Sequence, residues 1–473
     1  MSFRDLRSFL TELRKLGEVH EIGVPVEANW EVGTICSENF RQRGPVLVFN
    51  KIDNYQTPLV VGTLGTERRL SLAFGISPSL AAFRDKWDSG LERRTAPRIV
   101  NQAPCKDIKI DKIDLYRDPF PVPKWHLLDG GPELGTFHAV ITSGPDHGQI
   151  NVGMYRNEIL GRDMLGINFS SETRHAAMHW EMWKKKGTPM PVAIAIGLDP
   201  YLTILSASPV PYDINEYEVV QGLMGEPYEV IQAETSDLLV PAHAEIIIEG
   251  EIPMDDFVER EGPFGEFAGY MGPIQKNSRY IKVKQITHRK NPIFQGTYEG
   301  KFYNESKVIR SYIKSVHALD YLKKAGIPGV KDVCVTPAGC SGFHTVVSIK
   351  KSYFDHARAV IKLVLNQPDS FCKQCVVVDD DVDPWDSFEV EWAIATRMQA
   401  GRDLIIIKDG RSTSMDPSQV PSQKGRSDLL GIDATAPKDE YEREGATFPS
   451  IADPPDECVE RVRRKWPEYG LAD

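Results

Sequence analysis

The sequence lacks long apolar runs and an excess of basic residues. No stretch approaches the roughly 18 consecutive apolar residues that a membrane-spanning helix needs. Charged residues also interrupt the opening MSFRDLRSFL, where a signal peptide would be apolar. Acidic residues outnumber basic ones by 67 to 56, which argues against the basic face that a nucleic-acid partner requires. We therefore expect a cytoplasmic protein without a membrane or nucleic-acid partner.

Cysteine is also scarce, with seven residues scattered over 473 positions. An odd, dispersed set suits free thiols in a reducing compartment, so no disulfide is expected. The motifs G-x-G-x-x-G, G-x-x-x-x-G-K-[ST] and H-E-x-x-H are absent, which weakens the simplest nicotinamide, nucleotide and zinc-protease interpretations. A chain of this length and ordinary globular composition predicts two or three domains.

Residues 1–115 are predicted to form an N-terminal α/β domain. Apolar residues at helical spacing, followed by Gly17, predict an amphipathic helix over 3–16. Short apolar runs such as GPVLVFN and TPLVVGT then alternate with helical stretches such as 66–74, a pattern typical of α/β domains. The proline-rich YRDPFPVPKWH that follows fits neither a helix nor a central strand, so it marks a linker.

The rest of the chain divides into two further predicted domains, 116–302 and 303–473. Strand-like runs such as FHAVITSG, VAIAIGL and AEIIIEGEI dominate the first and predict a barrel or sandwich, interrupted by a helix at 172–186. In the second, strands and helices alternate, which favours a parallel sheet with crossover helices. The tail beyond 411 ends in a charged helix, CVERVRRKW, that we expect to reach over a partner subunit.

Three motifs that often carry chemistry are better explained by structure. Cys372 and Cys375 form a C-x-x-C, but no second pair follows at zinc-site spacing. In AGCSGFH, a turn before the next strand is a simpler interpretation of Cys340, Ser341 and His344 than a nucleophile beside a base. The acidic run 379–383 follows a buried-looking strand, where helix capping or fold specificity is favoured over Mg²⁺ binding.

The strongest chemical constellation contains two glutamates and one arginine. Glu261 and Glu266 enclose the turn-forming GPFG, so both carboxylates can reach one cleft. Paired carboxylates repel, which raises the pKa of one of them and lets it deliver a proton near neutral pH. Arg156, at the end of INVGMYR, would keep the other ionised and also offers a planar fork for a substrate carboxylate.

A second group combines Asn151, His175 and Glu216. An amide oxygen, an imidazole nitrogen and a carboxylate oxygen form a mixed, hard ligand set suited to Mn²⁺ or Mg²⁺ rather than to a Cys-rich zinc site. The residues alone leave this open, because a lone histidine on a helix is usually structural.

Seven blocks of the sequence resemble the UbiD family, in the same order as in that family. They are INVGMYR, the Arg174-His175 helix, SASPVPYDINEY, EGPFGEFAGYMG, VVVDDDVD, WAIATRM and LGIDAT. The resemblance covers nearly the whole chain, and EGPFGE is its most diagnostic block. It implies an N-terminal α/β region, a central split β-barrel that binds prenylated FMN, and a C-terminal α/β oligomerisation domain with a tail helix.

The resemblance also implies roles for individual residues. It places a divalent metal, on the cofactor phosphate, at Asn151, His175 and Glu216. It places the catalytic network at Arg156, Glu261 and Glu266, the last as proton donor. It places cofactor contacts at Asn151, Val152, Met154, Tyr155, Arg156, Arg174, His175, Ser208, Pro209 and Glu216. It places a potassium site, made mainly of main-chain oxygens, at Val152, Leu205, Ser206 and Ser208, with Glu216 shared.

One position departs from the family pattern. Members commonly carry a lysine four residues before the Asp of the GIDAT-like block, and Leu429 occupies that position here. Lys424 or Arg426 is the candidate replacement for a cofactor or phosphate contact.

The implied activity is the reversible, non-oxidative decarboxylation of an aromatic, heteroaromatic or α,β-unsaturated acid with prenylated FMN, Mn²⁺ (or Mg²⁺) and K⁺. The carbanion left by decarboxylation needs an electron sink that side chains do not offer, so a cofactor is required. A flavin prenyltransferase as cofactor supplier and a homodimer or homohexamer are the implied partners. Alternatives are a carboxylase in vivo, an aryl-CoA decarboxylase, and a non-catalytic flavin-binding or maturation partner. Retention of the network and metal residues argues against the last.

Overall fold

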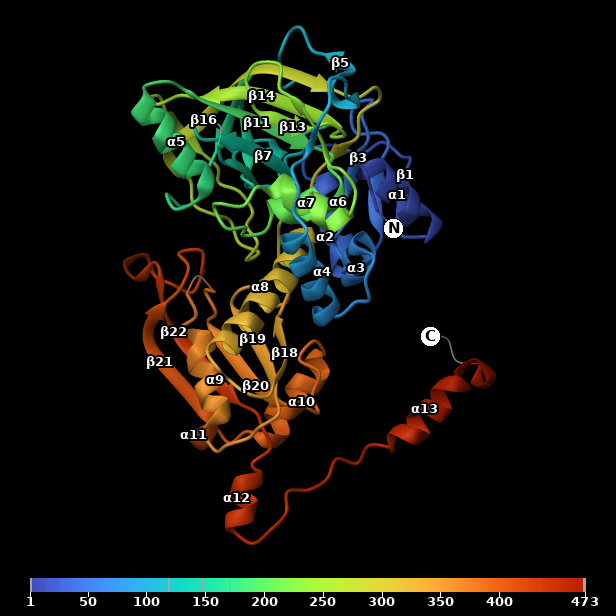
Figure 1. Cartoon of the computed structure of the whole chain (residues 1–473), viewed down its shortest axis with the longest axis vertical. Helices are drawn as coiled ribbons and strands as arrows, with labels where there is room; N and C mark the ends of the chain where they lie inside the picture. Colours follow the sequence, from blue (N-terminus) through green and yellow to red (C-terminus); the bar gives the residue numbers. More distant parts are fainter. Residues whose placement is uncertain (1, 118–119, 147, 170, 369, 471–473) are drawn as a thin grey trace.

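The computed structural model describes residues 2–117, 120–146, 148–169, 171–368 and 370–470. Figure 1 shows two lobes joined by the long helix α8 (Glu305–Lys324), with the sheets that precede α8 in the larger lobe and those that follow it in the smaller one. Among the described residues, no helix combines the length and the apolar character that a membrane crossing demands.

The larger lobe begins with a four-stranded mixed sheet and its helices. The strands lie in the order β1 (Val19–Ile22), β2 (Val46–Phe49), β3 (Leu59–Val61) and β17 (Phe294–Gln295). The helices are α1 (Leu6–Lys15), α2 (Glu31–Arg41), α3 (Glu67–Phe74) and α4 (Leu80–Glu92). The helix predicted over 3–16 is present as α1. It begins at Leu6 because the Asp5 side chain accepts the Ser8 N–H at 2.8 Å and caps it.

A curled antiparallel sheet forms the centre of the larger lobe. Its strands run in the order β6 (Glu133–Gly135), β9 (Asn157–Gly161), β10 (Met164–Ile167), β16 (Gln275–His288), β14 (Ile246–Ile252), β11 (Met190–Ile196), β7 (His138–Ser143) and β8 (Ile150–Gly153). The strands β5 (Ile108–Lys109) and β15 (Val258–Glu261) also pair with β16. A small sheet beside it contains β13 (Leu239–Pro241), β12 (Glu229–Gln232) and β4 (Arg98–Ile99).

Helices cover both faces of this sheet. Side chains alternate along a strand, and those of β11 divide accordingly: Ile194 packs in the cluster that contains Trp180 of α5 (His175–Lys186), whereas Ala193 and Ala195 pack in the cluster that contains Tyr201. Tyr201 belongs to α6 (Pro200–Ser206), which precedes α7 (Glu216–Met224). Because both faces are buried, the strand is apolar throughout rather than alternately polar.

The smaller lobe is a five-stranded sheet with helices on both faces. The strands lie in the order β18 (Val330–Val335), β19 (His344–Ile349), β20 (Gln374–Asp379), β22 (Arg426–Asp433) and β21 (Leu404–Arg411). The remaining helices are α9 (His356–Leu365), α10 (Ser387–Arg397), α11 (Ala400–Asp403), α12 (Lys438–Arg443) and α13 (Asp456–Arg464). Short 3-10 turns lie at Pro104–Lys106, Pro421–Gln423 and Trp466–Tyr469.

The expectation of a parallel sheet in this lobe is right for its centre and wrong for its edges. The strands β19, β20 and β22 are parallel, whereas β18 and β21 pair antiparallel to their neighbours. The β18 edge differs because β18 returns to β19 through a turn over 336–343, whereas a parallel neighbour needs a crossover connection of a dozen or more residues. At the other edge, the chain from β21 returns to β22 through 412–425 without a crossover helix.

The three motifs assigned to structure have structural partners. The Ser341 hydroxyl donates to the Lys307 carbonyl oxygen at 2.7 Å, and Arg397 holds Asp379 and Asp381 at 2.8 to 2.9 Å. All seven cysteines are free thiols, and Cys372 and Cys375 are buried.

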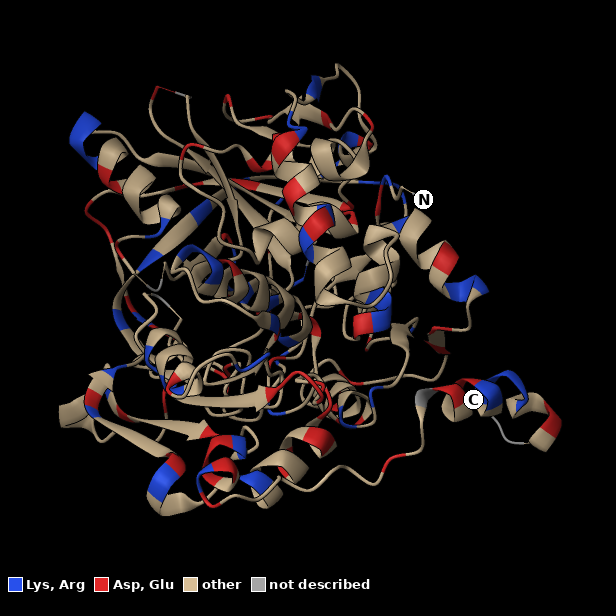
Figure 2. Cartoon of the chain, turned by 60° about the horizontal axis from the view of Figure 1, so that its bottom comes forward, with Lys and Arg blue, Asp and Glu red and all other residues tan. Residues whose placement is uncertain are grey.

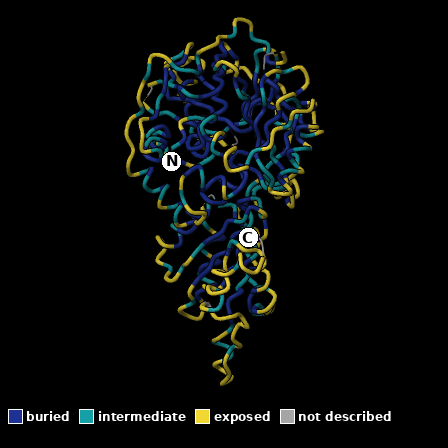
Figure 3. The backbone as a smooth tube through the Cα atoms, turned by 90° about the vertical axis from the view of Figure 1, so that its right-hand side faces the viewer, coloured by how far each residue is buried: buried dark blue, intermediate teal, exposed yellow. Residues whose placement is uncertain are grey.

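Surface features agree with the charge balance. Basic and acidic residues are interspersed in the view of Figure 2. Buried backbone lies inside the lobes, and the chain near α12 is mostly exposed (Figure 3). The tail carries α13 away from both lobes (Figure 1).

Candidate active site

A buried ion pair between Arg156 and Glu261 forms the centre of the candidate site. Arg156 lies between β8 and β9, and Glu261 ends β15. Nε and Nη2 of the guanidinium donate to the two carboxylate oxygens, each at 2.9 Å. The Glu261 side chain is 0% exposed and that of Arg156 is 14% exposed. This bidentate ion pair fixes the plane of the guanidinium.

Glu266 lies on the remaining edge of the same guanidinium. Nη1 of Arg156 donates to its Oε1 at 3.3 Å, and its side chain is 28% exposed. A tight turn holds it, since its N–H donates to Tyr270 and the Gly272 N–H donates to the Phe264 carbonyl oxygen. Burial raises the pKa of Glu266, although Arg156 opposes the shift. One carboxylate is thus fixed, and a second, of raised pKa, lies beside the same guanidinium.

Arg156 remains charged in this setting. Burial by itself would lower the pKa of its guanidinium, but the hydrogen bonds and charge of Glu261 raise it above the ordinary value. The Phe264 ring packs against the guanidinium at 5.2 Å. A permanent cation therefore lies between the two carboxylates, as the sequence predicts.

Two more glutamates, Glu133 and Glu158, lie against this pair, and sequence reasoning missed both. Carboxylate oxygens of Glu133, Glu158 and Glu261 all lie within 4.8 Å of one another. The available signal was weak: Glu158 follows Arg156 by two residues on a strand, and Glu133 sits in the short apolar PELGTF.

The proposed metal ligands lie on β8, α5 and α7. Glu216 is buried, its Oε2 has no partner among the described residues, and burial raises its pKa to about 8. Nδ2 of Asn151 donates to the Thr142 hydroxyl at 3.3 Å. Burial lowers the pKa of His175, which favours the neutral imidazole that binds metals. A partnerless buried carboxylate oxygen on α7, an amide on β8 and an imidazole on α5 are ligand types that suit a hard divalent cation.

The loop after α6 lies beside β8. The Met154 N–H donates to the Ser206 carbonyl oxygen at 2.8 Å, and the Ser208 N–H donates to that of Leu205 at 2.9 Å. The Val152 N–H opposes the rise in the Glu216 pKa. Each carbonyl oxygen keeps a second lone pair, so the predicted potassium ligands can still accept a cation.

The other predicted cofactor residues differ in exposure. Tyr155 is buried, and burial raises its pKa. A Cβ at Gly153 would come within 2.6 Å of the Tyr155 ring, so the close approach requires glycine there. Pro209 and Arg174 are exposed, and Arg174 precedes α5 directly.

Neither candidate replacement for the family lysine is free. Leu429 is 1% exposed in the apolar core. Lys424 donates to the Ser414 carbonyl oxygen, and Arg426 pairs with Asp409. Both are therefore engaged within their own hairpin.

Sequence reasoning also missed two basic residues on α8, Arg310 and Lys314, of which Arg310 is close enough to Glu266 for its charge to oppose the rise in pKa that burial causes there. Arg310 stacks on the ring of Phe267, 4.2 Å away, and neither Arg310 nor Lys314 has a hydrogen bond or ion pair within the described residues. Burial, followed by the charge of Arg310, lowers the pKa of Lys314 to about 7. The phenyl ring of Phe267 also meets Phe343 of the smaller lobe at 6.0 Å, so this region joins the lobes.

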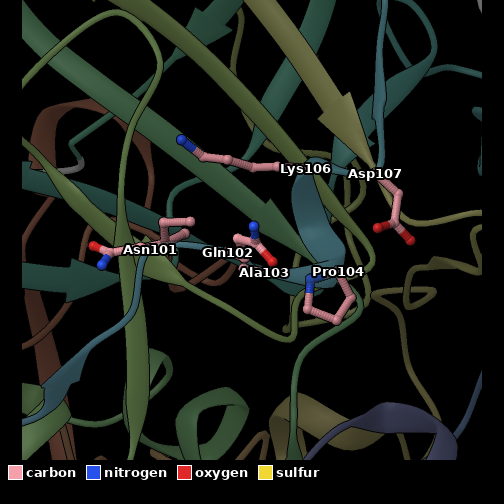
Figure 4. A pocket seen from close by; sticks show the side chains of 7 residues that line it. Asn101, Gln102, Ala103, Pro104, Lys106 and Asp107 are labelled. Atoms are coloured by element: carbon pink, nitrogen blue, oxygen red, sulfur yellow. The ribbon is translucent and has the colours of Figure 1, made fainter.

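The open hollow in Figure 4 is a separate feature. It is lined by residues 101–104, 106 and 107 with Ile231, and Lys106 there pairs with Glu234. It contains neither paired carboxylates nor an arginine, so we do not assign the chemistry to it.

Three family models match the chain. They describe the N-terminal, Rift-related and C-terminal domains of 3-octaprenyl-4-hydroxybenzoate carboxy-lyase, over residues 10–86, 98–302 and 307–434. The chain belongs to the UbiD family. Its members are decarboxylases, and this chain is a carboxy-lyase of that family.

Solved UbiD-class structures extend the match to nearly the full length. HmfF from Pelotomaculum thermopropionicum, in complex with FMN, is 31% identical with a TM-score of 0.87, covering 97% of this chain and 99% of that one. An evolved dimeric form of HmfF was solved with prFMN. Vanillic acid decarboxylase from Sedimentibacter hydroxybenzoicus is 29% identical, with a TM-score of 0.85 and 99% coverage of both chains. The 3,4-dihydroxybenzoic acid decarboxylase from Enterobacter cloacae is 25% identical, with a TM-score of 0.86 and coverage of 98% and 100%.

Proposed function

We propose that this chain reversibly decarboxylates an aromatic, heteroaromatic or α,β-unsaturated carboxylic acid and uses prenylated FMN to do so. The observation that carries the proposal is the contact of one arginine, Arg156, with two carboxylates of different character, Glu261 and Glu266. HmfF, which the chain resembles over nearly its whole length, has been solved with FMN and, in an evolved form, with prFMN.

The cofactor, when bound, supplies the sink for the electron pair that the departing carbon dioxide leaves behind. The chain's own residues do the rest. Glu261 holds the Arg156 guanidinium in one plane. Glu266, whose pKa is raised by burial, is the acid that delivers a proton to the substrate carbon. Burial of the network excludes water and strengthens these interactions.

Asn151, His175 and Glu216 would hold Mn²⁺ (or Mg²⁺) against the cofactor phosphate. The carbonyl oxygens of Val152, Leu205 and Ser206, with Ser208 and a share of Glu216, would hold K⁺. The remaining cofactor contacts lie just outside these elements: Met154 and Tyr155 follow β8, Arg174 precedes α5 and Pro209 follows α6. The partnerless Oε2 of Glu216 supports this assignment.

The proposal includes the organisation of the whole chain. Residues 116–302 would bind the cofactor, residues 303–473 would form the contact between subunits, and residues 1–115 would pack beside the cofactor domain. A homodimer or homohexamer is expected, with a flavin prenyltransferase as the cofactor supplier. The direction of the reaction in vivo depends on concentrations, so carboxylation, and action on an aryl-CoA thioester, are variants of the same chemistry.

One experiment tests the proposal. The protein is co-expressed with a flavin prenyltransferase, the bound cofactor is released for mass spectrometry, and carbon dioxide release is measured with a panel of aryl, heteroaryl and acrylic acids. Prenylated FMN in near-stoichiometric amount and release from at least one acid class are expected. A protein that carries flavin but releases nothing from any acid would favour a maturation partner instead.

A further inference from the structure

Three buried carboxyl groups meet behind the guanidinium of Arg156. Glu133 on β6 is the register partner of Glu158 on β9, so their side chains are neighbours across the sheet. Glu261 enters from β15, and oxygens of all three lie within 4.8 Å of one another. The three side chains are each buried.

The three carboxyl groups differ in the hydrogen bonds that they accept. Glu261 accepts two hydrogen bonds from Arg156, and Glu158 accepts the backbone N–H of Gly262. Both oxygens of Glu133 are without a partner among the residues that the structure describes. Glu133 is thus the group with the least to stabilise a negative charge.

The residues packed around the three carboxyl groups leave little room for a second cationic side chain. A Cβ at Gly130 would come within 2.6 Å of Glu158 Oε1 and 2.5 Å of the Gly262 carbonyl oxygen. A Cβ at Gly166 would come within 2.7 Å of the Glu261 side chain. Glycines therefore close the cluster on two sides, and one arginine faces three carboxyl groups.

An ionised carboxylate buried without a donor is costly, and neighbouring carboxylates that share a site cannot all ionise. We propose that Glu133 is a neutral carboxylic acid at neutral pH, that its O–H is directed at the carboxylate oxygens of Glu158 and Glu261, and that it positions the Arg156–Glu261 pair. It touches no reacting atom, so it is a positioning residue.

The charges that face Glu133 agree with this assignment. Burial raises its pKa well above the ordinary value, Arg156 opposes the shift, and the carboxylates of Glu261, Glu158 and Asp129 add to it. These four groups come from the β8–β9 connection, β15, β9 and the segment before β6.

The proton on Glu133 has a consequence for Arg156. An ionised Glu133 would add a third carboxylate behind the guanidinium and draw it away from Glu266, to which Nη1 donates at only 3.3 Å. A neutral Glu133 leaves that N–H available to Glu266. This functional consequence rests on the proposed role of Glu266, whereas the protonation state does not.

Thermal unfolding of the purified protein tests the protonation state without substrate. When the folded state raises the pKa of a glutamate, the unfolded chain loses that proton at a lower pH than the folded protein does. The free energy of unfolding therefore falls as pH rises above about 4.5. Glu133→Gln is neutral at every pH. The unfolding temperature of Glu133→Gln minus that of the wild type should therefore increase from pH 5 to pH 8. A constant or shrinking difference, or failure of Glu133→Gln to fold, would overturn the proposal.

Infrared difference spectroscopy gives a second measurement of the protonation state of Glu133. At pH 7 the carbonyl band of protonated carboxylic acids should be weaker in Glu133→Gln than in the wild type, because Glu133 no longer contributes to it, and it should be unchanged in the exposed control Glu259→Gln. A wild-type spectrum in which Glu133 contributes only carboxylate bands would refute the neutral assignment, as would a metal ion that co-purifies with wild type and is lost only from Glu133→Gln.

The positioning role has its own readout on any acid that the wild type decarboxylates. Glu133→Gln should keep kcat within about threefold, whereas Glu133→Leu, which cannot donate a hydrogen bond, should lose about tenfold in kcat with little change in KM. Equal losses in both variants would refute the positioning role. If no acid is turned over, the proposed function fails, yet the unfolding and infrared results still decide the state of Glu133.

Discussion

Removing Arg156 should destabilise the larger lobe measurably. Glu261 is fully buried, and among the described residues only Arg156 donates side-chain hydrogen bonds to it. Breaking a buried pair by removing one partner costs about 3–5 kcal/mol, because the other charge is left uncompensated. At roughly 2–4 °C per kcal/mol for a domain of about 200 residues, Arg156→Ala should lower the unfolding temperature by about 6–20 °C.

A matched control separates burial from charge. Arg162 is 76% exposed and pairs with Asp114 at 3.6 Å. Exposed pairs contribute about 0–1 kcal/mol, so Arg162→Ala should shift the transition by less than about 4 °C. Differential scanning calorimetry at one pH and one salt concentration measures both. If Arg156→Ala unfolds within the range of the control, the buried pair is not the structural centre of the site.

Three further outcomes follow from the site. His175→Ala and Glu216→Ala should lose metal and flavin together, whereas Glu218→Ala, two residues further along α7, should keep both. Unchanged metal and flavin contents would move the metal site elsewhere. Light scattering at micromolar concentration should give at least a dimer, against the 53.1 kDa of one chain, and a stable monomer would reject the proposed contact between subunits. Turnover should fall as pH rises through the raised pKa of Glu266, because the donor must be protonated, and a rate that keeps rising with pH would contradict this assignment.

Predictions that rest on local sequence patterns were reliable. Helical spacing followed by Gly17 was enough to predict α1, and the five-residue separation across GPFG was enough to predict that Glu261 and Glu266 lie close together, since both contact Arg156. Both signals lie within a few residues of the feature that they predict. The membership of the UbiD family came from seven ordered blocks, which together are far more specific than any single motif.

Contacts between distant segments could not be predicted in the same way. Glu133 reaches Glu261 only because β6 pairs with β9 and β15 pairs with β16, and no local pattern encodes that register. The prediction of parallel strands at the edges of the smaller lobe's sheet was wrong for a related reason. Alternating strands and helices do not reveal that β18 returns through a short turn.

The proton-donor role of Glu266 is the most direct test of the account. On an acid that the wild type decarboxylates, Glu266→Gln should bind flavin and metal normally but lose at least about 10²-fold in turnover, the usual scale for a positioned acid or base. Hydrogen–deuterium exchange at the product's former carboxyl carbon should fall in parallel, whereas the exposed Glu259→Gln should match the wild type. Normal turnover and exchange in Glu266→Gln would contradict the catalytic assignment.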